Sequence, residues 1–226
     1  LWDPEKSSKY IDQPENWAST QDRLRSIMDG LGVDYVEAVG EAAFYGPKVD
    51  IQFRTALGRE ESMSTIQLDF AAKERFGLSY MDETGSENGE VLVIHRAPLS
   101  THERFVAFLT EHWMGNFPTW LSPTQVQIIT ISERHAEHAA KVALDLREQG
   151  VRVSLDDSDS TIGRKIRTHR KMRPAYMLII GEEEAENGTV SIRARNGDQR
   201  NGVLLGDFID GIVEEINSRS PSMNMV

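Results

Sequence analysis

His95 and Arg104 are the residues whose types and positions are best suited to chemistry. His95 ends the apolar run 91–94, and an imidazole at the end of a buried strand must be hydrogen-bonded or bind a ligand. Arg104 lies one turn into a predicted helix, where a guanidinium and the positive helix end together suit an anion. The ordinary alternatives are a structural histidine and an ion pair from Arg104 to Glu103 or Glu111.

A second polar group consists of Tyr45, Lys48 and Gln67. Tyr45 and Lys48 flank a Gly-Pro turn, which holds a phenol and an ammonium near each other. Gln67 shares one face of the predicted strand 65–70 with Asp69, and from there its amide can contact a substrate in a pocket. The alternatives are a hairpin tip with an exposed lysine and a polar residue on an edge strand.

Basic residues crowd one predicted helix, 161–172, and continue just beyond its end. Such a cluster can neutralise phosphates of a nucleic acid, whereas the alternative is a solvated helix face. The residues are Arg164, Lys165, Arg167, Arg170, Lys171 and Arg173, with His169 among them.

The elements that must position these residues change in character along the chain. In the first part, alternating apolar and polar residues predict antiparallel hairpins, and helical spacing predicts helices. We expect a polar loop up to residue 16, a helix from 19–22 to 30–34, strands at 49–53 and 65–70, a central strand at 91–95 and a helix from residue 100.

A short proline-containing connector, 117–123, predicts a domain boundary at 118/119. After it strands and helices alternate, which predicts a compact sheet that is at least partly parallel. We expect strands at 126–131, 151–155, 175–180 and 190–194, helices at 132–150, 161–172 and 206–217, and a hairpin turn at 186–188.

The composition excludes several classes of protein. The chain has 226 residues, with 25 Lys and Arg against 36 Asp and Glu and a formal net charge of −11, which argues against indiscriminate nucleic-acid binding. Because the sequence has no Cys, disulfides, iron–sulfur clusters and a cysteine nucleophile are excluded. No apolar run approaches the roughly 18 residues of a membrane span. We expect a soluble, cytoplasmic protein with no membrane partner, and the first residue, Leu1, suggests a piece of a longer chain.

Several longer strings stand in the order and spacing found in threonyl-tRNA synthetases, and the chain resembles that family over nearly its whole length. The strings are Ala43–Lys48, Thr65–Phe70, Ile94–Phe105, Phe117–Leu121, Gly150–Val153, Ile162–Arg167 and Pro174–Gly181. The resemblance implies an α/β (α+β) fold. Residues 1–118 are expected to hold part of a class II synthetase antiparallel sheet with motif 3, and residues 119–226 a compact mixed-sheet anticodon-binding domain.

The resemblance also implies an activity, namely that of a threonine–tRNA ligase. Members of the family activate threonine with ATP and Mg²⁺ and transfer it to tRNA(Thr). Motifs 1 and 2 lie upstream of Leu1 in the family. We therefore expect this chain alone to be inactive and the full enzyme to be a homodimer.

The resemblance gives roles to the polar residues of the first part. Arg104 matches the motif 3 arginine that grips ATP phosphate, and a fixed guanidinium suits the charge that develops on pyrophosphate. His95 matches one ligand of a Zn²⁺ ion that binds the substrate's amino and hydroxyl groups. Tyr45, Lys48 and Gln67 match residues that line the threonine pocket. The family's other zinc ligands, a His and a Cys, are expected upstream.

In the second part, the resemblance implies contacts with tRNA. Asp159, Glu184 and Arg193 match residues that contact anticodon bases, which in single strands are bound through their edges and by stacking. Lys165 and Arg167 belong to the basic helix that would contact tRNA phosphates. The acidic stretch around Asp159 is otherwise a solvated loop.

The sequence departs from the family's pattern at a few positions. Asp159 stands where Asn is usual, and Ser100 stands where motif 3 usually has Gly. Glu61 and Ser62 stand where members often carry Trp-Gln. This change from Trp-Gln to Glu61-Ser62 removes a glutamine that lines the pocket in the family.

Two other interpretations remain open. One is a non-catalytic tRNA-binding or regulatory fragment derived from a class II synthetase, which upstream sequence would distinguish. The other is a related class II synthetase for proline, histidine or glycine. The string 43–48 and the position of His95 just before motif 3 argue against this second interpretation.

Overall fold

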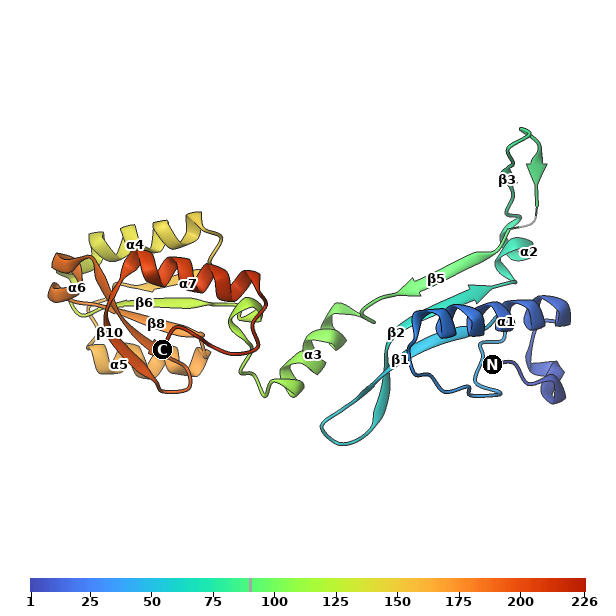
Figure 1. The fold of residues 1–226 in the computed structure, drawn as a ribbon, viewed down its shortest axis with the longest axis horizontal. Helices are drawn as coiled ribbons and strands as arrows, with labels where there is room; N and C mark the ends of the chain where they lie inside the picture. The colour runs from blue at the N-terminus through green and yellow to red at the C-terminus, as the bar shows by residue number, and fades with distance from the viewer. Residues whose placement is uncertain (90) are drawn as a thin grey trace. The chain divides into compact units, whose positions relative to one another are not determined.

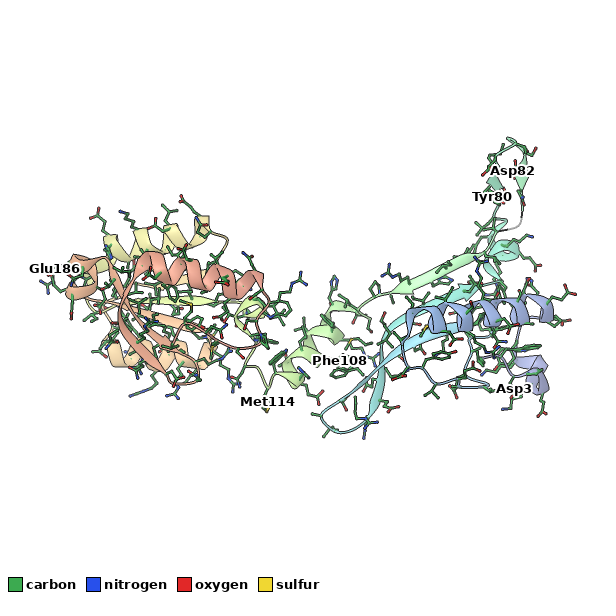
Figure 2. The ribbon with its side chains drawn as sticks, viewed as in Figure 1. Asp3, Tyr80, Asp82, Phe108, Met114 and Glu186 are labelled. Atoms are coloured by element: carbon green, nitrogen blue, oxygen red, sulfur yellow. The ribbon has the colours of Figure 1, made fainter. Side chains whose placement is uncertain are left out.

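The computed structural model describes residues 1–89 and 91–226, without the side chain of residue 7, and the chain folds as two compact units, 1–108 and 109–226 (Figure 1). The division falls within helix α3 (His102–His112), upstream of the predicted boundary at 118/119. The first turns of α3, where Figure 2 labels Phe108, belong to the first unit because the ring of Phe108 packs against that of Phe53, with centroids 4.9 Å apart.

The first unit is built around a small antiparallel sheet. Its elements are the 3-10 helix η1 (Pro4–Lys9), α1 (Pro14–Leu31), β1 (Lys48–Arg54), β2 (Glu60–Asp69), α2 (Ala72–Phe76), β3 (Tyr80–Met81), β4 (Glu87–Asn88), β5 (Val93–Ala97) and α3. The sheet has three strands in the order β1-β2-β5, and β3 pairs with β4 in a separate hairpin. The alternation of apolar and polar residues therefore predicted the hairpin of β1 and β2 correctly.

Helix α1 begins at Pro14, upstream of the predicted start at 19–22, so part of the expected loop is helical. Proline suits the first helical position because that residue needs no N–H partner. Trp17, in the first turn, is fully buried and packs edge-on against the ring of Phe70, so tertiary packing extends the helix. The helix ends where Gly32 adopts a φ of 65°, which confirms the predicted C-terminus.

Strand β5 lies at the edge of its sheet, although its apolar sequence predicted a central strand. Ile94 is 66% exposed. An apolar strand is expected to be covered on both faces and paired on both edges. Within the described residues, β5 has β2 as its neighbour in the sheet, so the prediction of a central strand is wrong for this part of the chain.

The second unit contains a single mixed sheet with helices on both faces. Its elements are η2 (Thr119–Leu121), β6 (Val126–Thr130), η3 (Glu133–His135), α4 (Ala136–Glu148), β7 (Val153–Asp156), α5 (Ile162–Met172), β8 (Tyr176–Ile180), α6 (Glu182–Asn187), β9 (Thr189–Ala194), β10 (Gln199–Leu204) and α7 (Leu205–Asn217). The strand order is β10-β9-β8-β6-β7. Strand β6 is parallel to β7 and β8, whereas β9 is antiparallel to β8 and β10. This confirms the prediction of a sheet that is at least partly parallel.

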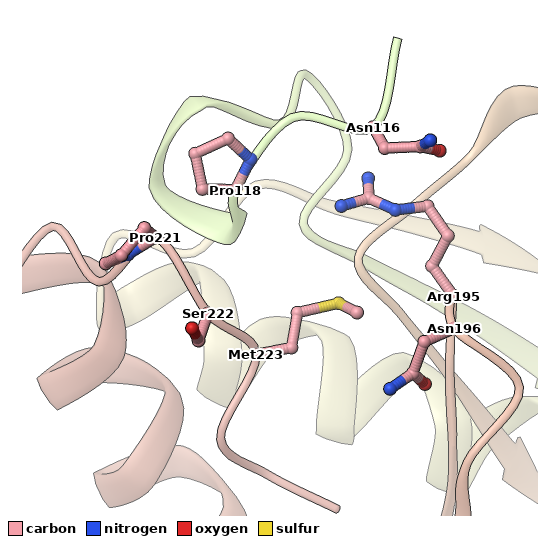
Figure 3. Close-up of a pocket in the computed structure, with 7 residues that line it drawn as sticks. All are labelled: Asn116, Pro118, Arg195, Asn196, Pro221, Ser222 and Met223. Carbon is pink, nitrogen blue, oxygen red and sulfur yellow. The ribbon is translucent and has the colours of Figure 1, made fainter. Parts of the chain in front are cut away.

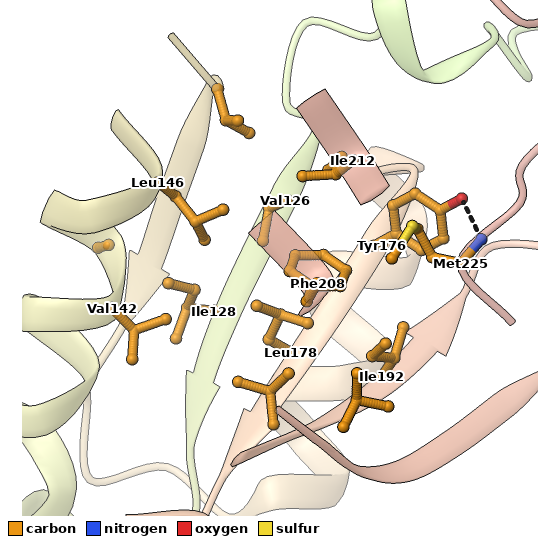
Figure 4. Close-up of a cluster of buried hydrophobic side chains, with 14 of the residues drawn as sticks. Val126, Ile128, Val142, Leu146, Tyr176, Leu178, Ile192, Phe208, Ile212 and Met225 are labelled. Atoms are coloured by element: carbon orange, nitrogen blue, oxygen red, sulfur yellow. Dashed lines mark hydrogen bonds between the residues drawn. The ribbon is translucent and has the colours of Figure 1, made fainter. Parts of the chain in front are cut away.

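The core of this unit lies between the sheet and helices α4 and α7, and α5 covers part of the other face (Figures 1 and 4). Because successive strand residues alternate between faces, one face of the sheet supplies the apolar side chains. They are Val126, Ile128, Tyr176, Leu178 and Ile192, packed with Val142, Leu146, Phe208 and Ile212 of the helices. Among the described residues, no helix combines the length and apolar composition that crossing a membrane requires.

Two sequence expectations for this unit differ from the structure. The hairpin turn predicted at 186–188 is the end of α6, where Gly188 has a φ of 64° and closes the helix. Strands β8 and β9 are thus antiparallel neighbours that a short helix connects. Strand β10 was not predicted, because Gln199 and Arg200 begin it with polar residues and its register shifts before Val203.

Candidate functional site

The register of the first sheet brings three of the predicted site residues into one row. Lys48 lies opposite Gln67, and Gln67 lies opposite His95. Residues directly opposite each other project from the same face of a sheet. The opposite face carries Leu68, which packs with the buried aromatic cluster around Trp17. The row is therefore on the face that α1 leaves uncovered.

Tyr45 joins this row through a short hydrogen bond. Its phenol Oη donates to Oε1 of Gln67 at 2.5 Å, and its ring centroid lies 5.9 Å from that of His95. The turn that carries Tyr45 approaches β2 closely, since a Cβ atom on Gly46 would lie 1.8 Å from the carbonyl oxygen of Leu68. Only glycine fits there, so the backbone of the turn fixes the phenol over the sheet.

Asp69 forms a hydrogen bond with the imidazole of His95. The sequence pattern placed Asp69 on the same strand face as Gln67 but did not predict this contact. The Nε2 atom of His95 lies 2.8 Å from Oδ2 of Asp69. The other oxygen, Oδ1, accepts hydrogen bonds from the backbone N–H groups of Ala71 and Ala72 at 2.7 and 2.9 Å. Partial burial raises the pKa of Asp69, but these three hydrogen bonds outweigh it, and the net pKa is lowered. Asp69 is thus ionised and orients the ring.

Lys48 and Arg104 are both paired with acids. The Nζ atom of Lys48 lies 2.7 Å from Oδ2 of Asp50 in the same strand, and its side chain is 28% exposed. Arg104 forms an ion pair with Glu61 of β2, rather than with Glu103 or Glu111. An anion that binds Arg104 must therefore compete with the Glu61 carboxylate. Lys48 is part of the polar row and not an isolated lysine at a hairpin tip.

The described residues do not complete a zinc site. No group of three or more His, Asp or Glu side chains that could hold a metal ion occurs among them. His95 and Asp69 offer a pair of donors, whereas a zinc site in a protein takes about three or four protein ligands. The described residues by themselves thus do not fit a resident zinc ion.

In the second unit, Glu184 and Arg193 border one face of the sheet. On β9, Val190, Ile192 and Ala194 are buried in the core, so Arg193 projects from the opposite face. Its guanidinium donates to Oε1 of Gln199 at 3.0 Å, while its Nε atom is buried without a hydrogen-bond partner.

Glu184 has a structural role at the start of α6. Its Oε2 accepts a hydrogen bond from the Gly181 N–H at 2.9 Å, and its Oε1 accepts one from the Ser191 hydroxyl at 2.6 Å. The first bond caps the helix. Ser191 and Arg193 are two residues apart on β9 and so project from the same face. The carboxylate and the guanidinium therefore belong to one polar surface, in which Ser191 was not predicted.

Asp159 is exposed in the loop between β7 and α5. Its neighbour Asp156 is instead held in place, with Oδ2 2.6 Å from Nε2 of His169 and Oδ1 accepting from the Ser158 hydroxyl at 2.7 Å. Partial burial raises the pKa of Asp156, but the hydrogen bonds from Ser158 and His169 outweigh it, and the net pKa is lowered. In this acidic stretch, the side chain of Asp159 is therefore accessible to a ligand, whereas Asp156 stabilises the local structure.

Lys165 does not lie on the exposed basic face of α5. The residue is 1% exposed, and its Nζ atom donates to the carbonyl oxygen and the hydroxyl oxygen of Thr130 at 2.9 and 3.1 Å. The prediction that Lys165 contacts phosphate is corrected, because its ammonium is enclosed by the protein. Arg167, on the same helix, is exposed and remains a candidate.

Comparison with known proteins identifies this arrangement. Residues 125–215 match the family model described as "Anticodon binding domain". The chain is 48% identical over 219 residues to the threonine–tRNA ligase of Lactobacillus acidophilus, an alignment that covers 96% of this chain and 34% of that protein. The chain belongs to the threonyl-tRNA synthetase family. Its match spans about a third of the length of these curated relatives.

Two further comparisons agree with this membership. The threonine–tRNA ligase of Bacillus velezensis is 49% identical over 214 residues, which cover 94% of this chain and 33% of that protein. A solved structure described as the RNA binding domain of threonyl-tRNA synthetase from Cryptosporidium parvum Iowa II superposes with a TM-score of 0.75 at 35% identity. That alignment covers 96% of this chain and 54% of the other. The predicted family and α/β (α+β) fold class of class II synthetases are confirmed.

Proposed function

We propose that the second unit of this threonyl-tRNA synthetase chain binds the anticodon of tRNA(Thr). The observation that carries the proposal is the match of residues 125–215 to an anticodon-binding domain. Within that domain, Arg193 and Glu184 lie on the same face of the sheet. Single-stranded bases are recognised through hydrogen bonds to their edges. Arg193 supplies N–H donors and Glu184 supplies acceptor oxygens. Asp159 adds an exposed carboxylate, and Arg167 is a contact for phosphate.

The first unit is proposed to supply part of a threonine-activating site to a longer threonine–tRNA ligase. Threonine carries a carboxylate, an ammonium and a hydroxyl group, and the row of Lys48, Gln67 and His95 with Tyr45 offers partners of each kind. Arg104 is the proposed contact for an ATP phosphate, once the phosphate displaces Glu61.

His95 is proposed as a zinc ligand of the longer protein only, since the residues described here do not form a zinc site by themselves. When bound, zinc would supply a Lewis acid for the hydroxyl and amino groups of the substrate. Within this chain, the carboxylate of Asp69 orients the imidazole of His95. Mg²⁺ with ATP, a homodimer and a cytoplasmic location likewise remain proposals for the longer protein.

Binding to transcribed tRNA(Thr), measured by fluorescence anisotropy at fixed salt, tests the anticodon proposal. We expect the 226-residue chain to prefer tRNA(Thr) over the same tRNA with altered anticodon bases. Arg193→Gln should weaken binding about tenfold and remove that preference, because it deletes donors to a base edge. Lys141→Gln on α4, across the sheet, is the control of equal charge change. Equal affinity for all anticodons would contradict the proposal.

The second candidate function is a non-catalytic tRNA-binding fragment. It is favoured by the absence of a complete metal site among the described residues and by the pairing of Arg104 with Glu61. Threonine-dependent ATP–pyrophosphate exchange separates the two. We expect no exchange from this chain alone and exchange from the longer protein that contains it. Loss of exchange in the longer protein on Arg104→Gln would support the proposed phosphate contact of Arg104 in the ligase, whereas a longer protein that shows no threonine-dependent exchange would favour the non-catalytic function.

A further inference from the structure

The second unit contains a cavity of about 230 Å³ that is lined by four arginines. Arg170 lies in α5 and Arg173 directly follows that helix. Arg193 lies in β9, and Arg195 directly follows that strand. The remaining lining is mostly apolar. It consists of Ile166, Pro174, Met177, Ala194, Gly197 and Gln199.

None of these guanidiniums is paired with a carboxylate among the described residues, although the chain carries a net charge of −11. Arg173 donates to the carbonyl of Met114 and, at 3.3 Å, to the side-chain oxygen of Asn116. Arg195 donates to the carbonyl of Arg173 at 3.1 Å and to that of Phe117. Four like charges around one cavity repel each other, and a bound anion would offset that repulsion.

Two of the arginines have unused donors. The Nε atom of Arg193 is buried without a partner, and a buried donor that lacks an acceptor costs free energy. The side chain of Arg170 is exposed and makes no hydrogen bond or ion pair with the described residues. The cavity thus has both the charge and the free N–H groups that an oxyanion needs.

Burial, and after it the nearby charge of Arg173, lower the pKa of Arg195. The backbone does not supply the attraction, because the cavity lies at the C-terminal end of α5, where the helix dipole favours cations. An anion here must be held by side chains. Guanidiniums suit a phosphate in particular because their planar N–H groups bind its oxygens in pairs.

We propose that this cavity binds one backbone phosphate of the RNA, next to the base that meets Arg193. The proposal rests on the proposed anticodon binding and adds Arg170, Arg173 and Arg195 as phosphate contacts. Arg193 lines the cavity and also projects from the face that carries Ser191, so a nucleotide can place its base on that face and its phosphate in the cavity. The apolar lining suits the sugar.

Arg170→Gln tests the proposal with the least disturbance, since this side chain has no partner among the described residues to lose. The affinity of the chain for tRNA(Thr) is measured over a range of salt concentrations. Loss of one phosphate contact should weaken binding several-fold and reduce the slope of log K against log salt by about 0.7 to 0.9. Lys141→Gln, which removes the same charge from α4, should leave the slope unchanged.

Chemical replacement of single phosphates locates the contact. In an anticodon stem–loop RNA, a methylphosphonate at the contacted position should weaken binding to the original chain but not weaken it further in Arg170→Gln. If tRNA binds and Arg170→Gln keeps the original slope, the phosphate site is wrong and the anticodon proposal stands.

A titration with inorganic pyrophosphate, followed by NMR of the arginine Nε groups, separates RNA phosphate from a free anion. Pyrophosphate that competes with tRNA and shifts Arg170 and Arg193 supports the site. If the chain binds no tRNA, the proposed function fails. Pyrophosphate binding in the cavity would then show that its ligand is a free anion and not an RNA phosphate. No shift together with no tRNA binding overturns both.

Discussion

Lys165 and Arg167 lie on the same helix and carry the same charge, yet the structure gives them different roles. Replacement of Lys165 by Met removes the ammonium and keeps most of the side-chain volume. The ammonium donates to both oxygens of Thr130, at 2.9 and 3.1 Å, so Lys165→Met leaves buried acceptors without this donor. Each such acceptor costs about 1–3 kcal/mol. Part of the cost is offset because a charge no longer has to be buried.

We therefore expect Lys165→Met to lower the free energy of unfolding by about 2 kcal/mol. Urea denaturation followed by circular dichroism measures this as a lower midpoint with an unchanged slope. At concentrations where the variant remains folded, its salt dependence of tRNA binding should equal that of the original chain, because a buried ammonium releases no counterion from RNA.

Arg167→Gln is the matched control and should behave in the opposite way. Its side chain is exposed, so the free energy of unfolding should change by no more than about 0.5 kcal/mol. As a phosphate contact it should reduce the salt slope of tRNA binding by nearly one. The reasoning is refuted if Lys165→Met unfolds like the original chain while its salt slope falls, since both results would place the ammonium on the surface.

Three further substitutions test other parts of the structure. Ser100→Gly should stabilise the chain by about 0.5–1 kcal/mol in urea, because Ser100 has a left-handed φ of 56°. Gly46→Ala should destabilise the first unit by more than about 2 kcal/mol, since its Cβ would overlap the Leu68 carbonyl, whereas Gly30→Ala meets no atom within 4 Å and should not destabilise the helix. The hydrogen bonds that lower the pKa of Asp156 stabilise the folded state at pH values above the ordinary pKa of 3.8. This stabilisation is lost as the pH falls through the lowered pKa. Asp156→Asn should therefore weaken the loss of stability measured below about pH 4.

Local sequence patterns were sufficient wherever one face of an element meets the core. The apolar residues of β6 and β8 predicted strands because burial selects those residues. The alternation around Val49–Phe53 also predicted a strand, although Ile51 is exposed. The same signal failed for β10, whose first residues are polar. It was misleading for β5, whose apolar sequence predicted a central strand, whereas among the described residues β5 pairs with β2 alone and lies at the edge of the sheet.

The candidate site divided in a similar way. The resemblance to a family placed Tyr45, Lys48, Gln67 and His95 together, and the strand register brings them into one group. The burial of Lys165 could not be predicted, because its partner Thr130 is 35 residues away in the sequence. A count of basic residues on a helix does not reveal which of them faces inward.

The arginines of the cavity also bear on the segment that follows α3. Arg173 and Arg195 donate to backbone carbonyls of Met114 and Phe117, and Arg195 also lines a second cavity, of about 490 Å³, together with Asn116 (Figure 3). A guanidinium is planar and can bind a carbonyl with one edge and an anion with another. A bound phosphate would restrict both side chains and, through them, the segment 114–117. Occupation of the anticodon-binding unit would thus stiffen the stretch of chain that leads to it.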